Sequence, residues 1–321
     1  MKKASKDHYK VRNWPQYNQA LVKRGSLTLW IEESVLESWQ DNQVSGEPGR
    51  PRKYHDGWIE LLLRIGMVYR LPLRQLEGLA GSLVKWLGKE GVVAVPDYST
   101  LSRRRTGLSV KMGVNAQELS GKRTIAVDST GLKVYGEGEW KVRQHGVSKR
   151  RTWRKLHLAI DPQSGMILAV EGSPNSISDD QMMPILLENI EPEIEVEQVC
   201  ADGGYDRGGS YQAIARRKAK ATIPPRKGAR IWQHGNTKAE KLDRDQNLRR
   251  IRKVGRKQWK KESGYHQRSK AETTMFRYKR IIGHRLSSRL LQNQIVEMKL
   301  GAKILNTMSS VGMPDSFKVS A

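Results

Sequence analysis

YHQRSKAETTMFRYK, residues 265–279, is the stretch of this chain in which reactive side chains are most regularly placed. Four of them stand at offsets of three, four and seven: Tyr265, Arg268, Glu272 and Lys279. At about 100° per residue, a helix carries the last three near one face, with the tyrosine close by. An isolated Arg268–Glu272 pair on a helix surface contributes only about 0.3–0.5 kcal/mol, and it accounts for neither Tyr265 nor Lys279. The stretch therefore predicts a functional helix whose meaning depends on the acids that precede it.

Two further acids stand upstream, each at the end of an apolar run typical of a β-strand. Asp128 follows the run in TIAVDSTGL, and Asp202 follows the run in VEQVCADGGYD. Magnesium prefers oxygen ligands and keeps several waters, so a few carboxylates suffice to hold it. Two metal ions about 3.5–4 Å apart can activate an attacking oxygen and stabilise a leaving oxygen at phosphorus. Two strand-end carboxylates and one on a later helix are the ligand set that such a phosphoryl-transfer site needs.

Together, these three elements resemble the DDE transposases of bacterial insertion sequences, in the branch with the signature Y-x2-R-x3-E-x6-K. The resemblance runs from about Thr124 to Lys279, and all four positions of the C-terminal pattern are present. It implies a catalytic domain with the ribonuclease-H-like fold and an enzyme that cleaves and transfers DNA strands. The first third of the chain carries no comparably specific motif.

The resemblance also implies roles for individual residues. The expected catalytic residues, which are also the expected ligands of two Mg²⁺ ions that Mn²⁺ can replace, are Asp128, Asp202 and Glu272. The expected contacts to the DNA backbone near the scissile phosphate are Tyr265, Arg268 and Lys279. Arg268 lies one helical turn from Glu272 and offers a planar pair of donors to a phosphate oxygen.

From residue 124 onward, the apolar pattern alternates between strands and helices. Three consecutive strands are predicted at residues 124–129, 152–162 and 166–174. A helix at 177–190, a strand at 196–206, a helix at 210–218 and a short strand at 219–225 follow. With the helix of Glu272 at the end, this is the order of the ribonuclease-H-like fold. The predicted fold class is therefore α/β, a ribonuclease-H-like mixed sheet with flanking helices, preceded by an all-α N-terminal region.

The N-terminal region is predicted to be helical. Helices are expected at residues 26–39, 57–71 and 73–88, and Pro96 and Asp97 are a typical start for one more. That last helix presents three basic residues together: Arg103, Arg104 and Arg105. A short connection between an apolar helix and a basic one indicates a helix-turn-helix module whose arginines bind DNA. The alternative is an ordinary helical bundle with solvated arginines.

The segment from Arg226 to Glu262 interrupts the pattern with positive charge. Its residues include 14 Lys and Arg against four Asp and Glu. We interpret it as a basic insertion that leads into the catalytic helix and that becomes ordered, in part, only when DNA is bound. Four of its arginines are candidate DNA contacts: Arg249, Arg250, Arg252 and Arg256. The predicted organisation is a helical DNA-binding region at 1–115, a catalytic domain at 116–310 with the basic insertion at 226–262, and a tail at 311–321.

Composition narrows the class of partner. The 321 residues carry 58 Lys and Arg against 33 Asp and Glu, a formal net charge of +25. This excess favours a polyanionic partner, first of all nucleic acid. The single Cys200 excludes an internal disulfide framework and a multi-cysteine zinc site. The sequence also has no phosphate-loop motif, so a nucleotide cofactor is not indicated. No apolar run approaches the ~18 residues of a membrane span, so we expect a cytoplasmic, nucleoid-associated bacterial protein.

The predicted function is that of an insertion-sequence transposase that works as a homo-oligomer on double-stranded DNA. It binds terminal inverted repeats, cleaves DNA strands and transfers 3′-ends to target DNA. Two alternatives stay open: a ribonuclease-H-like nuclease or junction resolvase that cuts without joining, and a catalytically idle DNA-binding regulator derived from a transposase. The cations around Glu272 favour the transposase over the first alternative. The presence of all three acids argues against the second.

Overall fold

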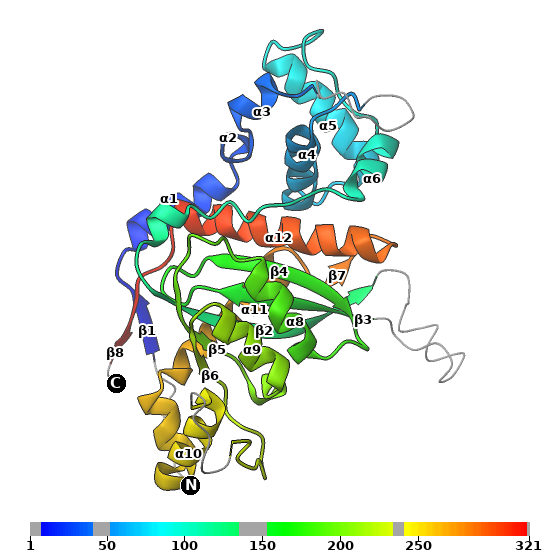
Figure 1. The fold of residues 1–321 in the computed structure, drawn as a ribbon. Coiled ribbons are helices and arrows are strands. Elements are labelled where there is room, and N and C mark those ends of the chain that lie inside the picture. The colour runs from blue at the N-terminus through cyan, green and yellow to red at the C-terminus, as the bar shows by residue number, and fades with distance from the viewer. Residues whose placement is uncertain (1–7, 41–51, 135–152, 234–240, 320–321) are drawn as a thin grey trace, which may run out of the picture. The chain divides into compact units, whose positions relative to one another are not determined.

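The computed structural model describes residues 8–40, 52–134, 153–233 and 241–319 (Figure 1). The chain folds as two compact units, Met1–Leu108 together with Ile304–Ala321, and Ser109–Lys303. The first unit contains the helices α1 (Trp14–Arg24), α2 (Leu27–Trp30), α3 (Glu33–Glu37), α4 (Asp56–Val68), α5 (Leu73–Trp86) and α6 (Tyr98–Arg105) and the strands β1 (His8–Val11) and β8 (Ser316–Val319).

The helices α4, α5 and α6 pack against one another in the first unit. The apolar helix α4 is buried continuously from Trp58 to Gly66. The amphipathic helix α5 buries Leu76, Ala80 and Leu83, a spacing of four and three that lines one face of a helix. Asp97 begins α6, because its carboxylate accepts the backbone N–H of the third helical residue at 2.7 Å. These three helices confirm the corresponding sequence predictions.

The predicted continuous helix at residues 26–39 is wrong. The segment divides into α2 and α3 because Ile31 (φ −96°, ψ 112°) and Glu32 (φ −94°, ψ 118°) have extended backbones. Trp30, next to the break, is 1% exposed, and its indole N–H donates to the carbonyl of Arg24 at 3.0 Å. Burial of this indole fixes the bend, whereas the helical pattern of the sequence alone gives no sign of it.

The first unit also holds a two-stranded ribbon made from segments near both ends of the chain. Strands β1 and β8 pair antiparallel, with Tyr9 opposite Lys318. Asn13 fastens the connection beside the ribbon: its Nδ2 donates to the carbonyl of Met313 at 3.0 Å, and its Oδ1 accepts from the backbone N–H of Asp315 at 2.7 Å. The predicted tail at 311–321 therefore includes a paired strand that the sequence did not reveal.

The second unit is built around a mixed sheet. Its elements are η1 (Ala116–Leu119), β2 (Arg123–Val134), β3 (Trp153–Ile160), β4 (Ile167–Pro174), α8 (Asp179–Glu188), β5 (Val196–Cys200), η2 (Gly203–Tyr205), α9 (Gly208–Arg216), β6 (Lys220–Thr222), α10 (Asp243–Glu262), η3 (Tyr265–Arg268), α11 (Ser269–Ile281), β7 (Arg285–Leu286) and the start of α12 (Leu291–Val311). The strand order is β4-β3-β2-β5-β6, and β7 pairs with the end of β2. Strands β2, β3 and β4 are antiparallel neighbours, whereas β5 and β6 continue parallel to β2. This arrangement confirms the predicted α/β class and the predicted order of β2 to β6 and their helices along the chain, whereas β7 was not predicted.

Helices cover both faces of this sheet. Figure 1 shows α8 and α9 over one face, where their apolar side chains join a buried core with β2, β3 and β5. On the other face, α11 packs against β2 and β3. The start of α12 approaches β4 so closely that a Cβ on Gly172 would lie 2.7 Å from the sulfur of Met298. Any other residue at this position would force the Met298 side chain to shift, and the α12 helix that makes the contact was not predicted from the sequence.

Candidate active site

The first two predicted acids lie on neighbouring parallel strands. Ala126 of β2 is paired with Cys200 of β5, and each acid comes two residues after one member of this pair. Asp128 and Asp202 are therefore at the same level of the sheet. The prediction that Asp128 ends a strand is wrong, because β2 continues to Val134. The polar residues that follow Asp128 stay paired with β3, and this long-range pairing keeps them in the strand.

The loop after β5 fixes the orientation of the second acid. The Oδ1 of Asp202 accepts the backbone N–H of Gly204 at 2.8 Å. A Cβ on Gly204 would lie 2.8 Å from that same oxygen, and a Cβ on Gly203 would lie 3.2 Å from the carbonyl of Pro224. Both glycines of the DGGYD sequence are therefore explained by close approach. They let the carboxylate fold back over its own loop.

The third acid comes from α11, and Arg268 connects it to the first. The predicted single helix for residues 265–279 is wrong in detail, since Tyr265–Arg268 form the 3₁₀ turn η3 and α11 begins at Ser269. The contact expected from the helical spacing nevertheless forms, because one guanidinium nitrogen of Arg268 donates to Glu272. Its other terminal nitrogen donates to Oδ2 of Asp128 at 2.6 Å. Arg268 thus bridges the strand acid and the helix acid.

The charges of these groups influence one another. Burial raises the pKa of the Asp128 carboxyl above its ordinary value. The Arg268 guanidinium opposes that rise, and the carboxylates of Asp202 and Glu272 add to it. For Arg268, burial disfavours the charged form, but the surrounding Asp128, Tyr265, Glu272 and Asp202 raise its pKa overall. The three acids and the arginine therefore form one electrostatic cluster.

The donor set of this cluster suits a hard divalent cation. Asp128, Asp202 and Glu272 offer only carboxylate oxygens, which is the ligand chemistry of Mg²⁺ rather than of zinc. In the described parts of the chain, no group of three or more His, Cys, Asp or Glu side chains is placed to hold a metal ion. Arg268 is instead the cation that two of the acids hold. The oxygen ligands of Asp128, Asp202 and Glu272 therefore suit Mg²⁺ by their chemistry. In this structure, Asp128 and Glu272 are paired with Arg268.

Comparison with known proteins decides the family. A family profile described as "Transposase DDE domain" matches residues 119–307, more than half of the chain. A second profile with the same description matches residues 22–137. The chain belongs to the DDE transposase family. The assignment made from the sequence is confirmed at this level, whereas the branch with the four-residue signature stays a prediction.

Two solved structures of transposases are among those similar to this DDE transposase chain. One is described as "Drosophila P element transposase strand transfer complex", with 12% identity and a TM-score of 0.26 over 66% of this chain and 47% of that chain. The other is described as "Crystal structure of a pre-cleavage Mos1 transpososome", with 12% identity and a TM-score of 0.21 over 56% of this chain and 62% of that chain. This chain therefore spans about half the length of the P element chain and less than two thirds of the other.

The two remaining residues of the signature differ in exposure. Tyr265 is only 9% exposed, and its ring packs against Trp259 with the centroids 5.8 Å apart. The guanidinium of Arg268 lies over the same ring, 5.9 Å from its centre, so Tyr265 packs against the arginine. Lys279 lies on α11, seven residues after Glu272, and is partly exposed. The expected contacts of Tyr265 and Lys279 with DNA stay predictions.

Two further residues fix elements around the candidate site, and only the second is signalled by the sequence. Gln198 on β5 donates from Nε2 to the carbonyl of Ser263 at 2.7 Å, which ties the strand to the turn before η3. Asp206, after the DGGY loop, is 5% exposed and accepts from Nε of Arg244 at 2.7 Å and from the Tyr211 hydroxyl at 3.0 Å. The second Asp of DGGYD was the available sequence signal for this anchor, because a buried acid requires partners.

The basic insertion, interpreted as partly ordered only on DNA, contains the helix α10. The helix is anchored at its start, where Asp245 is fully buried and accepts the backbone N–H groups of Trp232 and Gln233 at 3.0 and 2.8 Å. It is anchored again by Trp259, whose indole donates to Asn247 at 3.1 Å. A count of charges does not reveal these buried polar contacts, which anchor the helix to the rest of the unit. Residues 234–240 lie outside the described chain.

The four candidate arginines of α10 are exposed, but all have partners within the protein. Arg250 forms a two-bond ion pair with Glu262 at 2.8 Å. The other three donate to backbone carbonyls of the segment that precedes the helix: Arg249, Arg252 and Arg256. Gly255, between Arg252 and Arg256, has a non-helical backbone (φ 81°, ψ 155°) that kinks α10. Their role as DNA contacts stays a prediction.

In the first unit, the three predicted arginines of α6 have different environments. Arg103 is exposed and donates to the hydroxyl of Thr100 at 3.3 Å. Arg104 points into the unit, where it pairs with Asp56 at 2.5 Å and donates to the carbonyl of Tyr54 at 2.8 Å. Arg105 is partly buried. Arg103 is therefore the member of the cluster best exposed for an external ligand.

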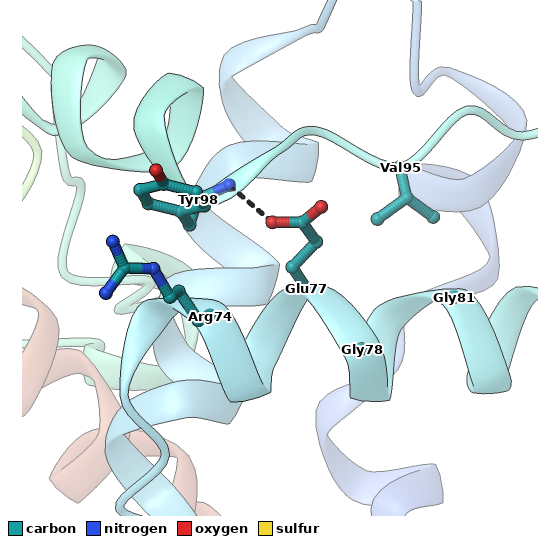
Figure 2. Close-up of a pocket in the computed structure, with 6 residues that line it drawn as sticks. All are labelled: Arg74, Glu77, Gly78, Gly81, Val95 and Tyr98. Carbon is teal, nitrogen blue, oxygen red and sulfur yellow. Dashed lines mark hydrogen bonds between the residues drawn. The ribbon is translucent and has the colours of Figure 1, made fainter.

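In the first unit, a pocket of about 540 Å³ lies between α5 and the start of α6 (Figure 2). Arg74 stacks over the ring of Tyr98 at 4.5 Å, and Glu77 accepts the backbone N–H of Tyr98 at 2.8 Å. Both contacts hold Tyr98, the first residue of α6, so they fix the start of that helix. None of the helices in the described chain is long and apolar enough to cross a membrane.

Proposed function

We propose that this chain is an active DNA transposase. It binds the terminal inverted repeats of its element, cleaves DNA strands there and joins the 3′-ends to target DNA. The observation that supports the proposal is that Asp128 and Asp202 lie at the same level of two neighbouring strands, and that Arg268 bridges Asp128 to Glu272 on α11, the helix packed against β2. Family membership supports this reading of the acids.

The chemistry follows from the side chains that meet there. Asp128, Asp202 and Glu272 are the proposed ligands of two Mg²⁺ ions. When bound, such ions activate the attacking oxygen and stabilise the leaving oxygen in an in-line displacement at phosphorus. Arg268 has a planar fork that suits a phosphate, and we infer that it turns to the scissile strand when DNA enters. Lys279 follows on α11 and would hold the backbone further along.

The DNA surface extends beyond the acids. We infer that the exposed cations of α10 bind phosphates without regard to sequence, because phosphate contacts fix position rather than specificity. Arg103 at the exposed side of α6 is the proposed base-reading residue for the inverted repeats, in the manner of a recognition helix in the major groove. The chain is proposed to act as a homo-oligomer on DNA and without a nucleotide cofactor.

The test is cleavage of DNA that carries the ends flanking the gene, in Mg²⁺ or Mn²⁺. Asp128→Asn, Asp202→Asn and Glu272→Gln should each lower cleavage by more than about 100-fold, beyond the loss usual for a residue that merely supports a ligand. DNA binding should stay intact. Glu197→Gln is the matched control, because Glu197 is an exposed acid on β5 and should be dispensable.

Several outcomes would contradict the proposal. Normal cutting by two of the three acid variants would remove the assignment of the site. Cutting without strand joining would identify a nuclease or resolvase, and specific binding without cutting in either metal would identify an idle regulator.

A further inference from the structure

Phe276 is placed where a polar residue is expected. It lies on α11, is one of only two phenylalanines in the chain, and is 69% exposed. The apolar face of this helix is complete without it, since Ala271, Met275 and Tyr278 are all buried at the spacing of four and three that points into the core. Phe276 is therefore not one of the buried residues that pack α11, and most of its ring is available to a ligand.

The position of Phe276 relative to the acids defines which ligand is in reach. It follows Glu272 by four residues, so the two side chains are neighbours on the helix surface, about 5–6 Å apart at Cβ. The same surface carries Arg268 on one side of Glu272, and Lys279 and Arg280 on the far side of Phe276. An aromatic ring thus stands in a row of cations, directly beside a proposed ligand of the metal.

The chemistry of this row favours DNA over a protein partner. The flanking arginine and lysine side chains attract phosphates, and an aromatic ring among them offers a surface on which an unpaired base stacks. A rise of about 6 Å over four helical residues corresponds to roughly two base steps of duplex DNA at ~3.4 Å each. A strand whose phosphate lies at Glu272 therefore brings a base from within about two nucleotides to Phe276.

We propose that Phe276 contacts a nucleobase next to the scissile phosphate, once that base has been unstacked from the end of the element. This contact would hold the strand in register with the acids, so Phe276 is a positioning residue rather than a catalytic one. The inference rests on the proposed transposase function. The motif that identified the site does not include this residue, since the signature passes from Glu272 directly to Lys279.

The experiment uses the full-length chain and DNA ends that carry 2-aminopurine, one position at a time, at the three nucleotides on either side of the cleavage point. Ca²⁺ replaces Mg²⁺ so that binding can be measured by fluorescence without cutting. The wild-type chain should change the fluorescence strongly at one position within two nucleotides of the cut. Phe276→Ala should abolish that change and weaken binding to the end by about 5- to 150-fold. Phe276→Trp should retain both.

Matched variants separate stacking from loss of apolar surface. Phe276→Leu keeps apolar area but no aromatic ring, and it should behave like Phe276→Ala. Ile185→Ala removes an exposed aliphatic side chain on α8 (41% exposed) and should leave both readouts unchanged. An abasic nucleotide at the responsive position should rescue cleavage by Phe276→Ala in Mg²⁺ in part, because unstacking then costs less.

Two results would overturn the inference. One is a 2-aminopurine response that is the same for wild type and Phe276→Ala at every position. The other is a change in the oligomeric state of the DNA-free chain on Phe276→Ala with unaltered DNA binding, which would assign the ring to a contact between copies. Failure of the proposed function is distinguishable, because the wild-type chain would then neither prefer these ends to scrambled DNA nor cut them.

Discussion

In the DNA-free chain, the guanidinium of Arg268 holds two carboxylates, on Asp128 and Glu272, that a divalent ion would also need. Arginine and metal therefore compete for the same charges. Arg268→Gln should strengthen Mn²⁺ binding to the free chain by about 5- to 150-fold, the usual range for coupled ligands, as measured by Mn²⁺ electron paramagnetic resonance. Adding DNA should strengthen Mn²⁺ binding to the wild type more than to the variant, because a phosphate offers Arg268 another partner.

The control for this prediction is Lys270→Gln, which removes an exposed positive charge from the same helix without breaking the bridge. It should change Mn²⁺ affinity far less. Equal affinities for wild type and Arg268→Gln would mean that the bridge does not restrict metal binding.

A second residue-scale consequence concerns acid stability. His157 on β3 is fully buried, and burial lowers its pKa to about 4, whereas an exposed histidine titrates near 6.5. Between about pH 4 and 6.5, the unfolded chain binds a proton that the folded chain does not, so the free energy of unfolding falls as the pH falls. The contribution is at most about 3 kcal/mol.

His157→Gln should remove most of this dependence, measured as the difference in urea unfolding between pH 7 and pH 4.5. The exposed His284 provides the control, because His284→Gln should retain the wild-type difference. The same loss of stability in both variants and the wild type would show that other groups dominate.

At the scale of single elements, α6 separates two roles within three consecutive arginines. Arg104 pairs with Asp56 and with the backbone of Tyr54, so Arg104→Gln should lower the free energy of unfolding by about 1–3 kcal/mol. Arg103→Gln should leave stability within about 0.5 kcal/mol and lower the preference for inverted-repeat over scrambled DNA by roughly 1–3 kcal/mol. Thermal unfolding and competition binding measure the two effects. Unaltered discrimination by Arg103→Gln would leave α6 with a structural role only.

The elements also show what sequence can and cannot predict. The strands β2 to β6 and the helices α4, α5 and α8 were predictable because each buries apolar residues, whereas the two-residue strand β7 was not predicted. The 3₁₀ turn at Tyr265–Arg268 was not, since a spacing of three residues fits both helix types and the left-handed Gly264 before it (φ 69°) has no unique pattern. Asp128 was placed at a strand end because polar residues follow it in the sequence. Those residues stay in the strand through pairing with β3, and a local pattern does not show that long-range contact.

The candidate site was predictable as a set of residues but not as an arrangement. The identities and order of Asp128, Asp202 and Glu272 carry the family pattern, and strand pairing places two of them together. The bridge through Arg268 depends on how α11 packs against β2, which no local pattern encodes. Phe276 likewise looks like a core residue in sequence, and only its exposure distinguishes it.

For the whole molecule, Asn13 joins segments about 300 residues apart through its bonds to Met313 and Asp315. Asn13→Ala should lower the stability of the first unit by about 1–3 kcal/mol and speed amide exchange in β1 and β8. The sheet of the second unit should exchange at its wild-type rate in hydrogen-exchange mass spectrometry. Asn18→Ala, at an exposed position of α1, should change neither. Equal protection in all three chains would mean that the ribbon does not depend on this clamp.

The pairing of β1 with β8 has a consequence for synthesis on the ribosome. Strand β1 emerges first, and its partner follows only after roughly 300 further residues, which takes about 15–60 s at ~5–20 residues per second. Until then β1 presents an unpaired edge, whereas β7, the last strand of the sheet that carries the acids, is made before β8. The unit proposed to read the inverted repeats therefore completes its β1–β8 pairing only after the sheet that carries the acids has all its strands.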